Sequence, residues 1–283
     1  MRRRAYLELG RVSNLPTVWT NVLAGVVLSG GQVSPGRLGA LVAALSAFYL
    51  GGMFLNDAFD RRWDAAMRPE RPIPSGRVAA REAFAVGFAL LGAGLALVAA
   101  AGGPRAAGAG AALGAAVVVY DAWHKGNPFS PLLMGLCRVL VYVTAALAAS
   151  GRVGGAAAVG AAALFAYLVG LTYAAKQETL TEVKGLWPLA CLAGPLVYYA
   201  ARAPAGGLLA LALAAALALW TVRAVSLLVR RPPFIPHAVA SLIAGISLLD
   251  GLLIALHGGG ALALGGVAGF ALTLVLQRRV QGT

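Results

Sequence analysis

The chain alternates between long apolar blocks and short connections that carry charges, glycine or proline. Residues 38–55, 83–103 and 153–175 contain no charged side chain. A helix needs about 20 apolar residues to cross the roughly 30 Å hydrocarbon core of a bilayer, and each block is near that length. Apolar residues fill these blocks continuously instead of forming the periodic stripes of a soluble helix. The pattern therefore predicts membrane-spanning helices.

The same pattern predicts nine spans and a weaker tenth, separated by turns such as Gly102-Gly103-Pro104. The spans are expected near residues 15–30, 39–57, 83–101, 107–122, 131–149, 155–175, 187–201, 206–228 and 237–256, with the weaker one near 261–276. No connection is long enough to hold a second, soluble domain. We therefore predict an all-α, polytopic membrane bundle of nine or ten helices, forming one domain over residues 1–283.

Composition agrees with this prediction. Hydrophobic residues make up 60% of the chain and charged residues 12%, whereas soluble domains carry about 25% charged residues. The 37 glycines suit close helix contacts in lipid. Cys137 and Cys191 both fall in apolar spans, where a free cysteine packs as a small apolar residue, and they form no framework of paired cysteines.

The distribution of the 23 Lys and Arg residues predicts the orientation. Eighteen fall on the side of the N-terminus, four fall on the other side (Arg37, Arg105, Arg152 and Arg202), and Arg138 lies inside a span. Because basic residues accumulate on the cytosolic side, we expect the N-terminus and every acidic motif to be cytoplasmic, most simply at the cell inner membrane. Since the net charge of +13 resides at helix ends and not on one basic domain, we exclude nucleic acid as a partner.

An acidic cluster ends the second predicted span. Asp57, Asp60 and Asp64 are spaced i, i+3 and i+7, so a helix presents them on one face, which Asn56 borders. Three neighbouring anions repel one another and need positive charge nearby. Arg61, Arg62 and Arg68 could supply it as local salt bridges. A divalent metal ion could do so too, because Mg²⁺ is bound by one or two carboxylates together with phosphate oxygens and waters.

Two further segments are expected on the same side of the membrane. Residues 68–77 are rich in proline and arginine, and Arg68 and Arg71 could hold phosphate oxygens or could simply set the topology. Glu178 and Glu182 are spaced i, i+4, and four predicted crossings separate them from Asp57. They could therefore face the first acidic cluster across the bundle, or belong to a solvated loop.

Other polar residues lie at the end of a span or inside one. Lys125 follows Tyr120 at a cytosolic helix end and could meet a diphosphate, whereas His124 is interpreted as an interfacial residue. Arg138 and Asp250 lie inside spans, where a charge indicates function by default, although the two could instead pair with each other or with the backbone.

Several enzyme classes lack support. The chain contains no glycine-rich phosphate loop that ends in Gly-Lys-Ser/Thr, no HExxH or CxxC motif and no GxSxG elbow. A CDP-alcohol phosphotransferase would need an Ala-Arg pair after Asp250-Gly251, and none follows.

The motif that begins at Asn56 resembles a known family signature. The pattern NDxxDxxxD, formed by Asn56, Asp57, Asp60 and Asp64, is followed by RPIPSG at residues 71–76. Together they resemble the first signature of the UbiA superfamily of intramembrane prenyltransferases. The resemblance implies nine membrane helices around a central cavity. It also implies two acidic motifs that hold Mg²⁺ and the diphosphate of a prenyl donor, with a hydrophobic acceptor that is usually aromatic.

The resemblance also implies roles for individual residues. It implies that Asp57, Asp60 and Asp64, with Glu178 and Glu182, are catalytic. It implies that the same five acids and Asn56 bind the metal, and that Asn56, Arg68, Arg71, Tyr120 and Lys125 bind the diphosphate. The chain departs from the family in the second motif, where Glu178 and Glu182 stand in place of several aspartates. A non-catalytic relative that binds or moves an isoprenoid or an aromatic precursor is therefore the alternative to a prenyltransferase.

Overall fold

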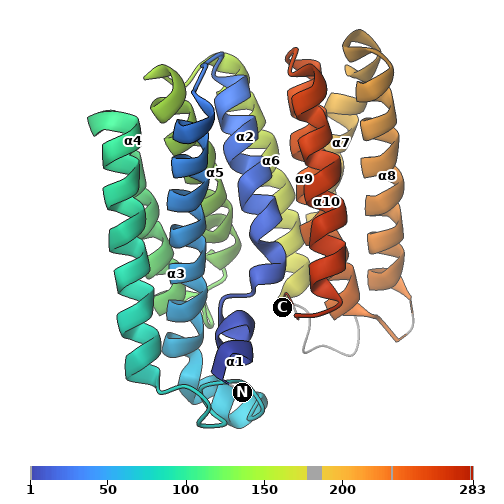
Figure 1. Cartoon of the computed structure of the whole chain (residues 1–283). Coiled ribbons are helices and arrows are strands. Elements are labelled where there is room, and N and C mark those ends of the chain that lie inside the picture. Colours follow the sequence, from blue (N-terminus) through green and yellow to red (C-terminus); the bar gives the residue numbers. More distant parts are fainter. Residues whose placement is uncertain (1, 177–186, 231, 281, 283) are drawn as a thin grey trace.

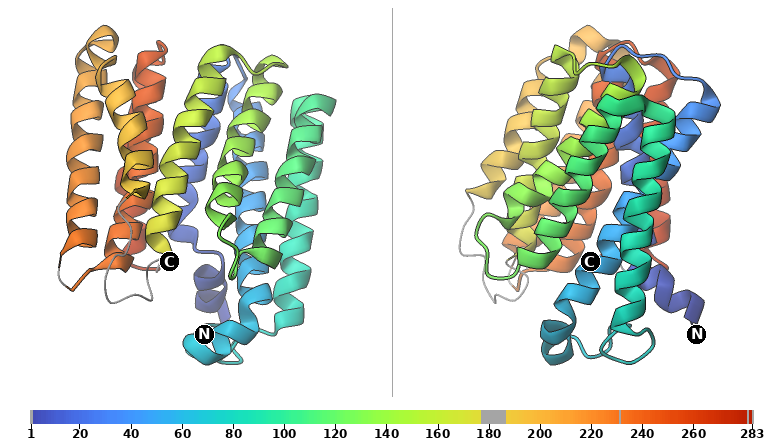
Figure 2. Two further views of the ribbon diagram at one scale, coloured as in Figure 1. Left: turned by 180° about the vertical axis from the view of Figure 1, so that it is seen from behind. Right: turned by 90° about the vertical axis from the view of Figure 1, so that its left-hand side faces the viewer.

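The computed structural model describes residues 2–176, 187–230, 232–280 and 282, and within them every regular element is a helix. The α-helices are α1 (Arg2–Leu9), α2 (Leu15–Leu28), α3 (Pro35–Met67), α4 (Ala80–Trp123), α5 (Ser130–Ser150), α6 (Gly155–Ala175), α7 (Pro188–Ala200), α8 (Gly207–Val229), α9 (Ile235–Leu256) and α10 (Leu264–Gln277). Short 3-10 turns precede α2, α8 and α10. Helices α2 to α10 stand side by side along one direction (Figures 1 and 2). The predicted all-α bundle is confirmed.

Helix α4 is two antiparallel arms joined at Gly103. The backbone of Gly103 has φ 75° and ψ −176°, a conformation that glycine adopts without strain, and Pro104 follows it. The first arm runs antiparallel to α3, so that Gly94 lies against Phe48. The second arm runs back parallel to α3 and brings Gly114 against the same Phe48 ring. The two spans predicted near 83–101 and 107–122 are therefore confirmed.

The described residues contain ten apolar helical segments. Seven helices are long and apolar enough to cross a membrane, two shorter ones are Val12–Leu28 and Pro188–Ala200, and α4 counts twice. An even number of crossings returns the chain to its starting side. Consistently, Asn14 Nδ2 donates to the carbonyl oxygen of Gly282 at 2.8 Å, and both termini lie at the lower end of the bundle in Figure 1. The count agrees with ten predicted spans and exceeds by one the nine that the resemblance implies.

Glycines allow the helices to approach closely. A Cβ on Gly25 of α2 would lie 2.8 Å from the Tyr142 carbonyl oxygen and 2.9 Å from Ala145 Cβ, both on α5. Small residues at such contacts let helix backbones pack in lipid, where no hydrophobic effect drives helices together.

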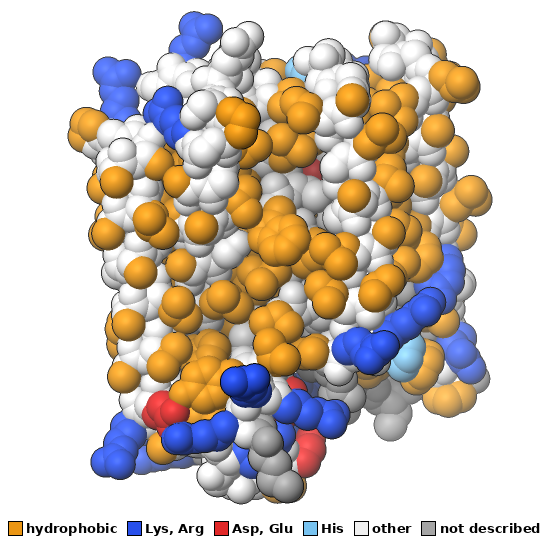
Figure 3. Space-filling view, in the orientation of Figure 1, with side chains coloured by type: hydrophobic (Ala, Val, Ile, Leu, Met, Phe, Trp, Pro, Cys, Tyr) orange, Lys and Arg blue, Asp and Glu red, His pale blue; other side chains and the backbone are white. Residues whose placement is uncertain are grey.

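Most Lys and Arg side chains lie at one end of the bundle, and a few arginines lie at the other. Figure 3 shows Lys and Arg side chains gathered at the lower end, which we call the basic end, and apolar side chains over the middle. At the opposite end, arginines cap helix termini: Arg37 Nε donates to the Ala101 carbonyl at 2.6 Å, and Arg105 Nη1 to the Gly151 carbonyl at 3.1 Å. This separation agrees with the predicted distribution of basic residues along the chain.

Candidate functional site

A cavity of about 430 Å³ reaches the basic end between α2, α3, α4, α5, α6 and α9. Its polar part is lined by Arg11, Asn56, Asp60, Trp63, Arg71, Asp121, His124 and Lys125. Its apolar part is lined by Leu45, Phe48, Leu113, Val117, Ile243 and Ile246. The cavity therefore joins a charged mouth to an apolar interior.

The three aspartates of α3 are buried at the mouth, and two of them, Asp57 and Asp64, are paired with arginines from two other segments. Asp57, Asp60 and Asp64 are only 5%, 5% and 1% exposed. Asp57 Oδ1 accepts from Arg11 Nη2 at 3.0 Å and from Arg71 Nη1 at 3.4 Å. Arg71 Nη1 also donates to Asp64 Oδ2 at 3.1 Å, so one guanidinium joins two carboxylates. A buried carboxylate is costly unless it is paired and hydrogen-bonded, and this pairing lowers the cost.

Asp60 has different partners, from the end of α4. Its Oδ2 lies 3.1 Å from Lys125 Nζ and 3.2 Å from His124 Nε2. Lys125 Nζ also lies 3.8 Å from the centre of the Trp63 ring, a cation–π contact that holds the ammonium group over the mouth. The structure thus brings the predicted Lys125 to the acidic cluster, and it makes His124, interpreted from the sequence as interfacial, a direct neighbour of Asp60.

Asn56 connects the cluster to Asp121. Asn56 Nδ2 donates to Asp121 Oδ1 at 3.1 Å, and Asn56 Oδ1 accepts from Arg11 Nη2 at 3.3 Å. Asp121 is 3% exposed, and among the described residues its Oδ2, like Asp64 Oδ1, has no hydrogen-bond partner. The sequence prediction missed Asp121, although an acid at the end of an apolar span is a signal that could have found it.

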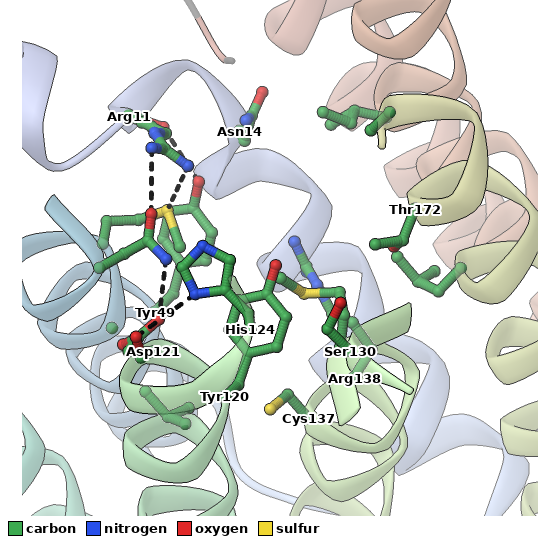
Figure 4. Close-up of a pocket in the computed structure, with 18 of the residues that line it drawn as sticks. Arg11, Asn14, Tyr49, Tyr120, Asp121, His124, Ser130, Cys137, Arg138 and Thr172 are labelled. Carbon is green, nitrogen blue, oxygen red and sulfur yellow. Dashed lines mark hydrogen bonds between the residues drawn. The ribbon is translucent and has the colours of Figure 1, made fainter. Parts of the chain in front are cut away.

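Arg11 is the second residue that the sequence prediction missed as part of the site. Its backbone has φ 41° and ψ 48°, the left-handed conformation that few residues other than glycine adopt. The Tyr49 hydroxyl donates to the Arg11 carbonyl at 3.2 Å and helps to fix this bend. Figure 4 shows Arg11 reaching the mouth from the segment before α2. No local pattern marks this role, because only the tertiary fold brings Arg11 to Asp57.

The remaining predicted residues divide into three groups. Tyr120 stacks on His124, with ring centres 4.9 Å apart, and Arg68 lines the cavity with its guanidinium 5.9 Å from the Trp63 ring centre. Arg61, one of the three arginines offered as local salt-bridge partners, is directed elsewhere: its Nη1 donates to the Ala58 carbonyl at 2.8 Å and its guanidinium lies over Phe84. Glu178 and Glu182 lie outside the described residues.

Lys176, at the end of α6, is the last described residue before the second acidic segment. Its Nζ donates to the Asn127 carbonyl at 2.5 Å and to Ser130 Oγ at 2.9 Å. Burial lowers the pKa of the Lys176 ammonium group. Lys176 lines the same cavity as Lys125, so two lysines from different parts of the chain reach it.

The donor atoms at the mouth suit a divalent cation that arrives with a phosphate. Among the described residues no three Asp, Glu, His or Cys side chains are grouped closely enough to form a metal cage. The free carboxylate oxygens of Asp64 and Asp121 are nonetheless buried there. Mg²⁺ takes few protein carboxylates and completes its octahedron with phosphate oxygens and waters. These residues therefore fit Mg²⁺ as part of a metal–phosphate complex.

The bundle and its cavity define a class: a membrane protein with a cavity inside the helix bundle that joins a charged mouth to an apolar interior. A sequence model of the UbiA prenyltransferase family matches residues 17–234, and the chain belongs to that family. The resemblance seen in the sequence is therefore confirmed. Family and helices together make the chain an integral, multi-pass membrane protein.

Several curated relatives are archaeal enzymes. A digeranylgeranylglyceryl phosphate synthase of Methanopyrus kandleri is 40% identical over 128 residues, which are 44% of this chain and 45% of the relative. The enzyme of the same name from Halobacterium salinarum is 35% identical over 188 residues, 65% of this chain and 64% of the relative. The chain thus spans less than two thirds of the length of either relative.

Solved structures share the fold. A UbiA homologue from Aeropyrum pernix superposes with a TM-score of 0.65 at 21% identity, over 86% of this chain and 96% of that one. A UbiA homologue from Archaeoglobus fulgidus, described as bound to GPP and Mg²⁺, gives a TM-score of 0.52 at 15% identity, over 96% and 99% of the two chains.

Proposed function

We propose that the protein transfers a prenyl group from an isoprenoid diphosphate to a hydrophobic acceptor within the membrane, and that the reaction depends on Mg²⁺. The observation that carries this proposal is the junction of a charged mouth with an apolar interior in one cavity. A prenyl diphosphate has the same two parts. The curated relatives and the homologue bound to GPP and Mg²⁺ support the donor class.

In this proposal the diphosphate lies at the mouth. Asn56, Arg68, Arg71, Tyr120 and Lys125 bind it, joined by Arg11. Asn56, Asp57, Asp60 and Asp64 hold the metal, with Glu178 and Glu182 as its ligands from the second motif. In the structure the carboxylates and cations neutralise one another, as in the pair of Asp60 and Lys125. A metal–diphosphate complex provides each group with a new partner of opposite charge, so the exchange leaves no buried charge unpaired.

The reaction begins with cleavage of the C–O bond at C1 of the prenyl chain. The bonding electrons leave with the diphosphate oxygen, whose growing charge Arg71 and Lys125 stabilise. Bound Mg²⁺ would neutralise further charge on the leaving group. The allylic cation forms in the apolar part of the cavity, where water is scarce. The nucleophile of the acceptor bonds to C1 and then loses its proton to a base.

The acceptor is a hydrophobic molecule, aromatic or of another lipid-soluble kind. The names of the curated relatives favour a glyceryl phosphate lipid. We place the mouth on the cytoplasmic side of the cell inner membrane, because the basic residues gather at that end. The single domain predicted over residues 1–283 stays a prediction.

The test uses the purified protein in lipid nanodiscs with Mg²⁺ and prenyl diphosphates of several lengths. Diphosphate release and prenyl transfer to a panel of aromatic and glyceryl phosphate acceptors are measured with and without a chelator. We expect turnover that needs Mg²⁺ and is lost in Asp57→Ala. Glu82→Gln is the matched control, because Glu82 lies at the same end but contacts Tyr6 and Arg2 outside the cavity. Tight donor binding without turnover across the panel would instead support the non-catalytic alternative.

A further inference from the structure

Arg138 is a charged side chain that lines the cavity without contacting the acidic cluster. Arg138 of α5 is eight residues beyond Ser130, which puts it about 12 Å along the helix from the basic end. Figure 4 shows Arg138 and Ser130 of α5 around the same hollow as Tyr120 of α4 and His124, which directly follows α4. Its guanidinium also lies 5.6 Å from the centre of the Tyr49 ring.

Arg138 differs from the arginines at the mouth in its partners. Arg11 and Arg71 each form a salt bridge with an aspartate of α3. Among the described residues Arg138 forms no salt bridge, and its only hydrogen bond runs from Nη1 to Asn21 Oδ1 at 2.9 Å. A guanidinium has five N–H donors, and one inside a membrane protein is costly unless an anion or several acceptors satisfy it. The remaining donors of Arg138 are available to a ligand in the cavity.

A buried polar network holds Arg138 in place. Asn21, which accepts from Arg138, donates through Nδ2 to Asp250 Oδ2 at 2.8 Å. Asp250 also accepts from Thr20 Oγ1 at 2.5 Å and from the Tyr142 hydroxyl, and it is fully buried. Three donors thus occupy the Asp250 carboxylate, which meets Arg138 only through Asn21. The network fixes the guanidinium without neutralising it by direct contact.

Position separates this arginine from the diphosphate site. The mouth already supplies Arg11, Arg71 and Lys125 to the leaving group, and all three contact the aspartates of α3. Arg138 lies deeper, among cavity residues of α5 such as Cys137 and Val141. A second anion, held apart from the first, fits this arrangement.

We propose that Arg138 binds the anionic group of the acceptor, a carboxylate or a phosphate ester, and so directs the nucleophile of the acceptor toward the mouth. This inference rests on the proposed function, because it takes the cavity to receive an acceptor. Asn21 and Asp250 act as positioning residues: they touch no substrate and orient the guanidinium. The planar guanidinium can bind either acid through two parallel hydrogen bonds.

The experiment measures binding of acceptor probes alone, without donor or Mg²⁺, to the full chain in nanodiscs. Two anionic probes, 4-hydroxybenzoate and geranylgeranylglyceryl phosphate, distinguish the carboxylate from the phosphate source. Their neutral counterparts are 4-hydroxybenzamide and geranylgeranylglycerol. The variants are Arg138→Gln, Arg138→Lys and, as a matched control, Arg105→Gln, whose arginine caps a helix at the opposite end.

We expect the wild-type protein to prefer one anionic probe over its neutral counterpart by roughly tenfold or more, the value of one charge-assisted hydrogen bond. Arg138→Gln should abolish that preference, Arg138→Lys should restore part of it, and Arg105→Gln should keep it. The affinity for geranylgeranyl diphosphate with Mg²⁺ should stay within about twofold in Arg138→Gln, a result that a merely structural role would not give.

The inference is overturned if the wild-type protein shows no preference for either anion, if Arg138→Gln keeps the preference, or if Arg138→Gln loses donor binding equally. A failure of the proposed function is distinguishable from these outcomes. Probe binding that depends on Arg138 in a protein that never transfers a prenyl group would contradict the proposed reaction and support the anion site.

Discussion

Lys125 Nζ lies 3.1 Å from Asp60 Oδ2, although a whole helical hairpin separates the two residues in the sequence. The same ammonium group rests on the Trp63 ring, one turn further along the helix from Asp60. Lys125 is therefore oriented by an anion and by an aromatic face together. Because the ammonium group is already held in place, it loses little conformational entropy when a ligand anion replaces Asp60 as its partner.

Replacing Asp60 by Asn should reduce Mg²⁺-dependent prenyl transfer about a hundredfold or more, because a charge that stabilises the transition state through the metal is removed. The amide keeps the size of the side chain, so the fold should persist. Initial rates at saturating donor and Mg²⁺ test this prediction. Glu82→Gln, which removes a carboxylate from the same end, should keep the wild-type rate; equal losses in both variants would contradict a specific role for Asp60.

Replacing Lys125 by Gln should raise the donor KM roughly 10- to 100-fold, which corresponds to one lost hydrogen bond to a charged group. Lys125→Arg keeps the positive charge and should recover part of the affinity. Steady-state kinetics over a range of donor concentrations measures both. An unchanged KM in Lys125→Gln would mean that Lys125 serves only to neutralise Asp60.

Replacing Gly25 by Ala should destabilise the protein by about 1–3 kcal/mol, since the added methyl group meets the α5 backbone and the two helices must separate. Gly39→Ala is the control, because a Cβ at Gly39 has no neighbour within 4 Å. Thermal unfolding in detergent compares the two variants. Equal melting temperatures would show that α2 and α5 are not as close as described.

A membrane-impermeant maleimide should label cysteines at Ala66 and Arg279 from the same side of the membrane, and a cysteine at Arg152 from the other. All three positions are exposed, and ten crossings put the first two at the same end. The test uses sealed vesicles and a background in which Cys137 and Cys191 are replaced. Labelling of Arg279→Cys together with Arg152→Cys would restore the count of nine spans.

The sequence predicted what depends on local spacing. Asp57, Asp60 and Asp64 share a helix face because i, i+3 and i+7 are neighbours on any helix, and the apolar blocks predicted the spans by length alone. The pairing of Arg11 with Asp57 was beyond prediction. It joins residues 46 positions apart, and it depends on the left-handed bend at Arg11 and on the packing of α2.

The same limit applies to Arg61, one of the three arginines that the sequence offered as partners of the cluster. In the sequence, Arg61 is adjacent to Asp60 and is the nearest cation, but consecutive residues on a helix point in different directions. In the structure Asp60 therefore pairs with Lys125, which follows a different helix. Adjacency in sequence predicted the need for positive charge but not its source.

The turn at Gly103 has a consequence for the charges at the mouth. A continuous helix of 44 residues would be about 66 Å long, more than twice the thickness of the hydrocarbon core. Lys125 would then emerge far from Asp60, on the opposite face of the membrane. One glycine with a positive φ angle therefore sets the parity of every later crossing. The pairing of Lys125 with Asp60 thus depends on a glycine at the other end of the bundle, which touches none of the charged groups.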